Sequence, residues 1–306
     1  MPRCRLGREY IDVAVMTTTI RARQAAAFRA MGEIEPMPYP IVINNFPFIW
    51  RYDVEACLDH LVAQGYRRIE LLLTAPYCWP RSLKKDVRGR ISERVRSGEI
   101  EIVALNPGGF DNNLASPAEE VRALAGGILA EVVDLAADWR AKGIVMSPGA
   151  GRPLLPPPIT MLEGWSRAGI ETLLARTEQS GVSLLLENIP YSFWPKADQI
   201  AGLIEAIDHP NLGAVYDVPN AVFAGESPDH GFERLKQHLR LVHFSDTPLS
   251  SWKHDRIGAG VVRFDEALQA MRRIGYEGDL VLEIIDADGD AAIAESVAAI
   301  RRLDPD

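Results

Sequence analysis

One unit recurs eight times along this chain from residue 38 onward: a short apolar run, a loop with Pro, Asn or aromatic residues, and an amphipathic stretch that ends at glycine. Each unit is typical of a β-strand followed by an α-helix. The runs are apolar throughout rather than alternating, as strands buried on both faces of a parallel sheet require. Eight strands are therefore predicted, at residues 41–43, 69–73, 100–105, 143–146, 183–186, 212–216, 239–243 and 279–284.

Local signals also mark where the helices begin and end. Ser116 and Thr160 each stand three residues before a glutamate, Glu119 and Glu163, which predicts a capping box at the start of two helices. Glycines at five helix-to-strand joints are expected to adopt the left-handed conformation that ends a helix. They are Gly65, Gly98, Gly143, Gly181 and Gly275.

These units fit one closed barrel better than two domains. A chain of 306 residues would allow two domains of roughly 150 residues, but α/β barrels often reach about 250 residues as one unit. No linker interrupts residues 40–303, so we predict a single (β/α)8 TIM barrel over residues 38–306, after a poorly ordered N-terminal extension of residues 1–37. A doubly wound open sheet is the alternative, but it would favour a glycine-rich turn where residues 44–47 read Asn-Asn-Phe-Pro.

Charge and cysteine content exclude several classes of partner. The 33 Lys and Arg residues against 42 Asp and Glu give a net charge of -9, which argues against a nucleic-acid partner. Cys4, Cys57 and Cys78 form no CxxC pair, so neither a disulfide framework nor a thiolate zinc site is supported, and a cytoplasmic location is the simplest expectation. No apolar run approaches the roughly 18 residues of a membrane span, so no membrane partner is expected.

The chemistry of a barrel lies at the carboxyl ends of its strands. Four consecutive predicted strands, the fifth to the eighth, end at Glu187, Asp217, His243 and Glu283. A single carboxylate at such a place is often only a helix cap or a salt-bridge partner. Four ligand-type residues on four adjacent strands instead predict one metal site.

The expected ion follows from the donor atoms. Three carboxylates and one imidazole suit an octahedral divalent ion, Mn, Mg or Co, better than a closed tetrahedral zinc site, with zinc as an alternative. Without a cation the clustered carboxylates would repel each other, and their pKa values would rise.

The chain here resembles the xylose isomerase-like barrels, which include sugar isomerases, ketose 3-epimerases, inosose dehydratases and trizinc abasic-site endonucleases. The resemblance covers roughly residues 40–303. It is carried by Glu187-Asn188, by the Asp217 segment, and by three motifs at residues 243–246 (His-Phe-Ser-Asp), 254–260 and 275–284. It implies one divalent metal on Glu187, Asp217, His243 and Glu283 and a small carbohydrate or polyol substrate. Barrels of this type often associate into homo-oligomers, but no interface can be read from one sequence, so the oligomeric state stays open.

The resemblance also implies that Glu187 and Glu283 form the acid–base pair, and the chemistry agrees. Isomerisation or epimerisation requires a proton to leave the carbon beside a carbonyl and a proton to return. A metal would hold the substrate oxygens and stabilise the enediolate, while the two glutamates transfer the protons.

Several further residues are candidate substrate contacts. His254 and Asp246 occupy places where the family often contacts substrate, although Asp246 is equally expected to orient a loop or His243. Asn220 and Trp252 stand where the endonucleases have metal ligands, so a second and third metal lose ligands, but both side chains remain candidate sugar contacts. Arg152, after two glycines, is a candidate for binding an anionic group.

Glu70 is expected to be structural. The loops carry many aromatic residues, and if half of them line the mouth, the site is enclosed and partly apolar. These residues are Phe46, Trp50, Tyr77, Trp79, Phe110, Tyr191, Phe193, Trp194 and Trp252.

The sequence therefore predicts a metal-dependent isomerase or epimerase of a small keto sugar or polyol. A dehydratase or lyase of the inosose or dehydroshikimate type is the alternative, because it also begins with proton removal beside a carbonyl. An abasic-site endonuclease and a noncatalytic sugar-binding barrel are weaker alternatives.

Overall fold

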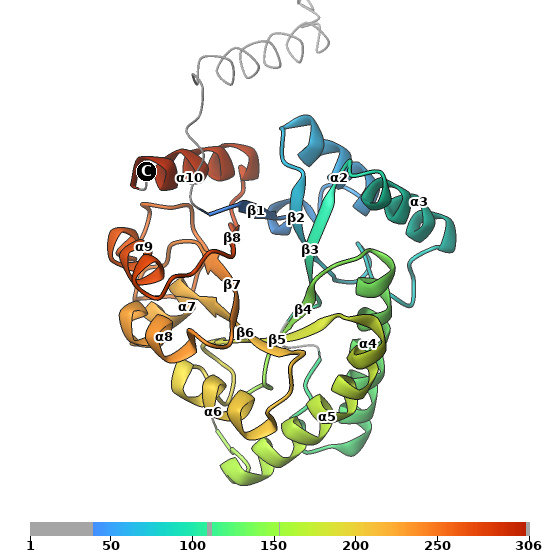
Figure 1. The fold of residues 1–306 in the computed structure, drawn as a ribbon, viewed down its shortest axis with the longest axis vertical. Coiled ribbons are helices and arrows are strands. Elements are labelled where there is room, and N and C mark those ends of the chain that lie inside the picture. The colour runs from blue at the N-terminus through green and yellow to red at the C-terminus, as the bar shows by residue number, and fades with distance from the viewer. Residues whose placement is uncertain (1–38, 109–111, 153, 304–306) are drawn as a thin grey trace, which may run out of the picture. The chain divides into compact units, whose positions relative to one another are not determined.

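The computed structural model describes residues 39–108, 112–152 and 154–303. The predicted extension, residues 1–37, lies outside them. Eight parallel strands close into one barrel in the order of the chain, which confirms the TIM barrel and excludes the doubly wound sheet (Figure 1). The strands are β1 Ile41–Asn44, β2 Arg68–Leu72, β3 Glu101–Asn106, β4 Gly143–Met146, β5 Ser183–Glu187, β6 Leu212–Asp217, β7 Leu239–Phe244 and β8 Asp279–Leu282.

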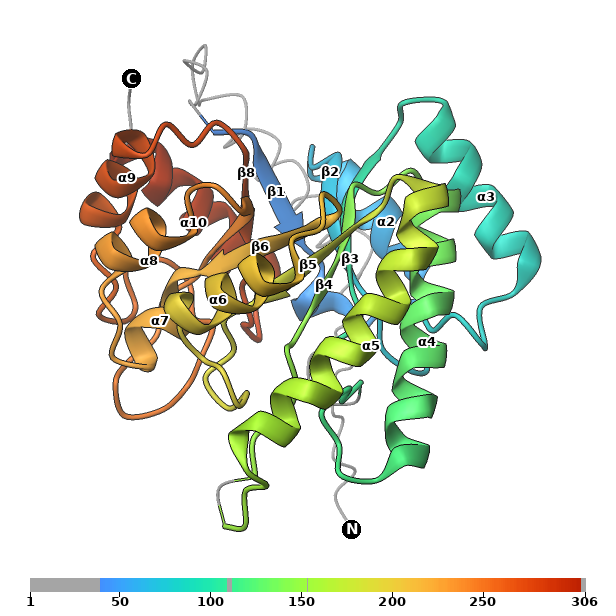
Figure 2. The same ribbon diagram turned by 60° about the horizontal axis from the view of Figure 1, so that its bottom comes forward.

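Helices surround the strands on the outside of the barrel (Figures 1 and 2). Two pairs of neighbouring strands shift in register, β2 with β3 and β6 with β7. The helices are η1 Phe46–Phe48, α2 Val54–Ala63, α3 Lys85–Arg96, α4 Glu119–Asp138, α5 Ile159–Ser180, α6 Ala197–Ile207, α7 Val218–Phe223, α8 Pro228–Leu235, α9 Phe264–Arg273 and α10 Gly289–Leu303.

The predicted strands agree with the observed ones to within two residues at either end, because fully buried strands leave an unbroken apolar signal. A cluster of small, mostly β-branched side chains packs between the strands, with members from every strand except β2. Such residues fill a barrel interior and make it a solid support for side chains at its rim. They are Val42, Val103, Ala104, Val145, Leu185, Val215, Leu241 and Val281.

Two predicted helix starts are wrong. The residue before α4 is Ala118 and the residue before α5 is Pro158, and neither gives a side-chain cap. The Ser116 hydroxyl instead accepts a hydrogen bond from the Ala118 backbone N–H, which makes a local turn before the helix. A serine can satisfy either a turn or a helix start, and here the turn forms.

Four of the five joint glycines have positive φ, as expected, but Gly143 does not. It lies inside β4, where an added Cβ would come within 2.9 Å of the Ser183 carbonyl oxygen of β5. Close approach of two strands, rather than a helix end, therefore requires glycine here. Arg140 takes the left-handed conformation after α4 instead.

The amino end of the barrel is closed by paired charges. Arg68, the first residue of β2, contacts Glu101 at 2.8 Å and Asp279 at 2.6 Å. Lys142, which precedes β4, contacts Asp279 at 3.0 Å and Glu101 at 3.4 Å. Two cations and two anions, from three strands and the residue before a fourth, thus neutralise each other.

No helix in the described part of the chain is both long enough and apolar enough to cross a membrane.

Candidate metal centre

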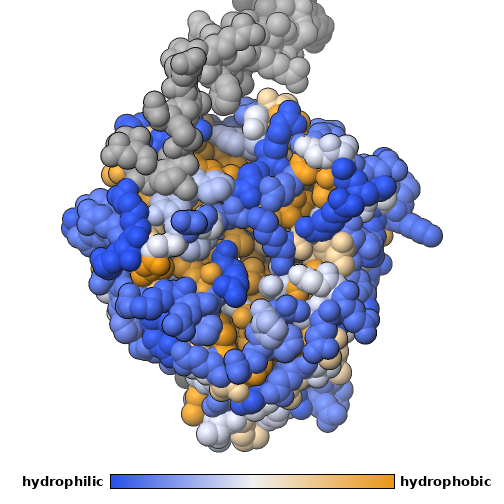
Figure 3. Space-filling model, in the orientation of Figure 1, coloured by the Kyte–Doolittle hydropathy of each residue, from blue (hydrophilic) through white to orange (hydrophobic). Residues whose placement is uncertain are grey.

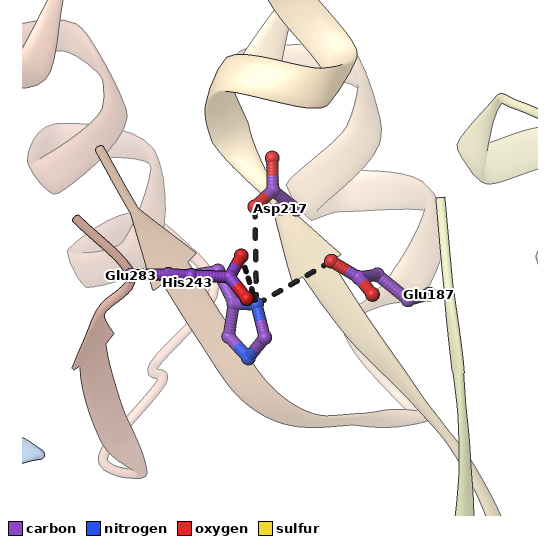
Figure 4. A group of neighbouring side chains, drawn as sticks. All are labelled: Glu187, Asp217, His243 and Glu283. Carbon is purple, nitrogen blue, oxygen red and sulfur yellow. Dashed lines mark ion pairs between the residues drawn. The ribbon is translucent and has the colours of Figure 1, made fainter. Parts of the chain in front are cut away.

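The four predicted ligands meet at the carboxyl end of the barrel. Glu187 ends β5, Asp217 ends β6, His243 is the last residue but one of β7, and Glu283 directly follows β8. One ligand atom from each lies within 4.8 Å of the others. The carboxylates point toward a single ring nitrogen of His243 (Figure 4).

The ring nitrogen at the centre is His243 Nδ1. It lies 3.4 Å from Glu187 Oε1, 3.4 Å from Glu283 Oε2 and 3.8 Å from Asp217 Oδ2. All four side chains are buried. Two of the converging atoms, Asp217 Oδ2 and His243 Nδ1, have no hydrogen-bond partner within the described residues. Buried polar atoms of this kind normally have a partner, so these two atoms are placed to bind an ion.

The spacing of the ligand atoms fits a first-row divalent ion or magnesium. Metal–ligand bonds of about 2.0–2.2 Å place ligands on opposite sides of an ion about 4.0–4.4 Å apart. A group that spans no more than 4.8 Å therefore needs only a small contraction to coordinate one ion. Within the described ranges it is the one group of three or more His, Cys, Asp or Glu residues whose ligand atoms lie this close together.

The electrostatics of the group also fit a cation. Burial, together with the neighbouring Glu187 and Glu283 carboxylates, raises the pKa of Asp217 well above its usual value. Burial would lower the pKa of His243, but Glu70 and Glu283 raise it well above its usual value overall. Without a metal the site therefore retains protons, and a divalent ion would replace them.

A second layer of polar residues lies beneath these ligands. Glu70, in the middle of β2, is fully buried, and its Oε2 lies 3.0 Å from His243 Nε2. Its Oε1 accepts hydrogen bonds from Asn44 Nδ2 at 2.7 Å and Asn106 Nδ2 at 3.2 Å. The sequence predicts a structural role for Glu70, and its contacts here are with other buried side chains of the barrel. A carboxylate inside an apolar strand is the sequence signal for such a contact, because a buried charge needs a partner.

Three of the predicted substrate contacts lie beside the ligands. Trp252 Nε1 donates to Asn220 Oδ1 at 2.6 Å, and Asn220 Nδ2 lies 3.5 Å from Glu187 Oε1. His254 Nδ1 lies 3.3 Å from Glu283 Oε2 and 3.0 Å from the hydroxyl of Ser245. Burial lowers the pKa of His254, which keeps this imidazole neutral at neutral pH.

A cavity of about 640 Å³ opens above the centre, within the range that holds small-molecule ligands. As the turned view in Figure 2 shows, the strands run away from the viewer in Figure 3, so the face drawn there is the opposite, amino end of the barrel, where apolar residues lie within a hydrophilic surround. The floor of the cavity is polar and much of its wall is apolar. Its described lining is Phe46, Leu72, Asn106, Gly108, Glu187, Ile189, Asn220, Trp252, Lys253, His254, Asp255, Glu283 and Ile285.

The other two predicted contacts lie elsewhere. Asp246 is buried, and its carboxylate accepts hydrogen bonds from the backbone N–H groups of Thr247, Gly258 and Val262, so the structure favours its loop-orienting role. Arg152 is exposed and is not among the described residues that line the cavity.

The loop before Arg152 offers no free anion site. The N–H groups of Gly149, Ala150 and Gly151 bond to Ser147, Asn113 and Tyr191 respectively. An anion would have to displace protein partners from all three.

Fewer aromatic residues line the mouth than expected. Phe46 and Trp252 face the cavity, whereas the Trp50 side chain is 75% exposed and the buried Tyr77 accepts a hydrogen bond from Asn45. Phe110 lies outside the described residues. Aliphatic Leu72, Ile189 and Ile285 supply much of the apolar wall instead.

Sequence comparison identifies the family. Residues 58–303 match the xylose isomerase-like TIM barrel. The chain belongs to this family. An uncharacterized protein of Methanocaldococcus jannaschii is 27% identical over 194 residues, which cover 60% of this chain and 64% of that protein. The fructoselysine 3-epimerase of Shigella flexneri is 23% identical over 242 residues, which cover 77% of this chain and 86% of the epimerase.

Solved structures of the family have the same fold. A D-tagatose 3-epimerase-like protein superposes with a TM-score of 0.73 at 19% identity, over 86% of this chain and 98% of that one. The IOLI protein, whose structure holds a zinc atom, superposes with a TM-score of 0.73 at 18% identity, over 86% of this chain and 97% of that one. At these identities the likeness establishes the barrel and its order of strands.

Proposed function

We propose that this protein is a divalent-metal-dependent isomerase or epimerase of a keto sugar or related polyol. The observation that carries the proposal is the pair of glutamates, Glu187 and Glu283. They come from β5 and from the residue after β8, yet one oxygen of each lies 3.4 Å from the same atom, His243 Nδ1. A substrate carbon placed above this point would have a carboxylate on each side.

The two carboxylates are suited to take a proton from the carbon beside a carbonyl and to return one. Glu283 is fixed for this task, because its Oε1 is contacted by Asn44 Nδ2 at 3.3 Å and Asn106 Nδ2 at 3.4 Å, which leaves Oε2 toward the centre. A bound divalent ion would supply the positive charge that stabilises the substrate oxygens as the proton leaves. Glu187, Asp217, His243 and Glu283 are the residues that would hold it.

The remaining polar groups of the floor would bind and orient the substrate. Asn220 and the neutral His254 line the cavity, and Trp252 fixes the amide of Asn220 through its indole N–H. A fixed amide and a neutral imidazole discriminate sugar hydroxyls by hydrogen bonding without adding charge. Asp246 acts indirectly in this scheme, by holding the loop that carries His254.

The wall of the cavity bears on the choice of substrate. A free ketose has hydroxyl groups along its length, whereas Phe46, Leu72, Ile189 and Ile285 present apolar surface. The fructoselysine relative is named for a sugar joined to an amino acid. Both points support including keto sugars that carry a substituent, alongside free ketoses, among the substrates to be tested.

The ion is proposed to be Mn, Mg or Co, which suit three carboxylates and one imidazole, with zinc as the alternative supported by the IOLI structure. Comparing the activity of metal-free protein after it is reloaded with each ion in turn would rank the ions.

Deuterium exchange followed by NMR tests the function. The metal-loaded protein is incubated in heavy water with free ketoses, substituted ketoses, inososes and dehydroshikimate, and EDTA is added to a parallel sample. We expect deuterium on the carbon beside the carbonyl together with a new isomer, both lost with EDTA. A dehydrated product would contradict isomerisation and favour the lyase. The absence of both deuterium exchange and product with every substrate, despite bound metal, would contradict the proposal.

A further inference from the structure

Glu70 has a hydrogen-bond partner at each of its two oxygens, although it is itself no ligand in the proposed centre. Its Oε2 faces His243 Nε2 at 3.0 Å, and its Oε1 faces the amide nitrogens of Asn44 and Asn106. All four side chains are buried. Both oxygens of this buried carboxylate therefore have protein partners, as buried polar groups normally do.

The direction of these hydrogen bonds is fixed by the backbone. Asn44 Oδ1 accepts from the Phe46 N–H at 2.9 Å, and Asn106 Oδ1 accepts from the Gly108 N–H at 3.2 Å. Neither amide can turn over without losing that bond, so both present their NH2 groups inward. Glu70 Oε1 therefore faces two donors, and an ionised carboxylate has no hydrogen of its own to donate from Oε2.

We propose that Glu70 is a positioning residue that makes His243 a metal ligand through Nδ1. Because Glu70 Oε2 can only accept, it holds the ring proton on Nε2, and the lone pair of Nδ1 is left facing the three carboxylates. The same two amides that bind Glu70 also contact Glu283 Oε1, so one buried network orients two of the four ligands. This assignment rests on the metal site of the proposed function but not on its substrate or reaction.

Glutamine cannot replace Glu70 in this network, because its side chain has only one acceptor oxygen. In Glu70→Gln the single oxygen can face His243, which turns the new NH2 group against the NH2 groups of Asn44 and Asn106. The oxygen can instead face the asparagines, which turns the NH2 group against Nε2 and forces the ring proton onto Nδ1, where it blocks the metal. In Glu70→Ala, by contrast, water can enter and accept from all three donors.

Zinc affinity, measured by competition with a chromophoric chelator, shows whether metal binding depends on the hydrogen-bond acceptors of Glu70 or on the volume of its side chain. We expect Glu70→Gln to weaken zinc binding by roughly 10–100-fold, the usual cost of losing such a partner, and Glu70→Ala to weaken it less. Glu226→Gln is the matched control, because Glu226 is also a buried glutamate that accepts from a side chain, Tyr216, and from a backbone N–H, that of Ala197. Its zinc affinity should stay within twofold of the parent protein.

Two results would overturn the assignment: Glu70→Gln binding zinc within twofold of the parent protein, or Glu70→Ala binding more weakly than Glu70→Gln. Melting curves in EDTA show whether each variant is folded. A parent protein that binds no zinc, manganese or cobalt would instead remove the metal site of the proposed function, and the assignment with it.

The ring proton itself gives a test that is read in the parent protein. In zinc-loaded protein labelled with ¹⁵N-histidine, we expect His243 to carry a slowly exchanging proton on Nε2 and the metal on Nδ1. The His243 signals are identified by their loss in His243→Asn. A proton on Nδ1 would contradict the assignment.

Discussion

The two ends of this barrel use the same kinds of residue to opposite effect. At the amino end, Arg68 and Lys142 neutralise Glu101 and Asp279 through contacts of 2.6–3.4 Å. At the carboxyl end, three carboxylates converge on His243 Nδ1, and the ion pairs described for them are with the histidines His243 and His254. One end pairs its carboxylates with the permanent cations of arginine and lysine, whereas the other pairs them only with histidines.

This difference separates structural charges from functional ones. A network whose positive and negative charges neutralise each other gains nothing from binding a ligand. Removing one of its residues lowers the stability of the protein. A buried cluster that keeps unpartnered atoms, such as Asp217 Oδ2 and His243 Nδ1, costs stability until a cation arrives. Function in this protein is therefore expected where the fold leaves charge uncompensated.

Glutamate-to-glutamine changes at the two ends should give the largest contrast. Glu283→Gln removes a proton-transfer group, and we expect the rate of deuterium exchange to fall at least 10³-fold, about 4 kcal/mol in barrier height. Glu101→Gln, at the amino end, should leave that rate within twofold. Equal losses in the two variants would contradict the division between the ends.

Metal removal should lower the melting temperature more as the pH rises. The pKa values of both Asp217 and His243 are raised in the metal-free protein, so stability from their bound protons is present at low pH and is lost as the pH rises through those values. Metal binding needs both groups deprotonated, so the melting temperature should differ more between metal-loaded and EDTA-treated protein as the pH rises above 6.5.

Metal in 100-fold excess over its dissociation constant should add about 2.7 kcal/mol to the free energy of unfolding. Melting curves across a pH series measure the difference in melting temperature between metal-loaded and EDTA-treated protein. If this difference became smaller with rising pH, protons would not compete with the metal at Asp217 and His243.

Asp279→Asn should reverse the pattern seen for Glu283→Gln. Asp279 is 7% exposed and accepts from Arg68 and Lys142, so its loss leaves two cations short of a partner. We expect the free energy of unfolding to fall by about 2 kcal/mol, measured by urea denaturation, with zinc affinity unchanged. A drop in zinc affinity without a loss of stability would place Asp279 in the functional class.

Trp252→Phe should give the smallest effect. The variant keeps most of the apolar surface but removes the N–H that binds Asn220 Oδ1 at 2.6 Å. Losing one such hydrogen bond costs about 1 kcal/mol, so KM for the substrate found by deuterium exchange should rise about fivefold, with kcat nearly unchanged. An unchanged KM would remove Asn220 or its orientation from substrate binding.

The strands and the four converging ligands could be predicted from the sequence for a simple reason. Buried parallel strands give unbroken apolar runs, and a barrel puts the carboxyl ends of consecutive strands side by side. Glu187, Asp217, His243 and Glu283 each stand at the end of such a run, so their convergence follows from topology alone.

The contacts across the barrel could not be predicted in this way. Glu70 and His243 are 173 residues apart on β2 and β7, strands that are not neighbours, and their contact depends on closure of the barrel and on side-chain direction within the strands. The position of Arg152 depends on loop conformation. A loop aromatic such as Trp50 or Tyr77 can turn outward or into the protein, and the sequence carries no periodic signal for either choice.

Metal stoichiometry tests the central claim most directly. The protein and its Asp217→Asn variant would be stripped with EDTA, reloaded with manganese, freed of unbound ion by gel filtration and measured by mass spectrometry of the elements. We predict one ion per chain for the parent protein and a much smaller fraction for Asp217→Asn. An equal metal content in the two proteins, or no metal in the parent, would contradict the claim that these four residues form a metal site.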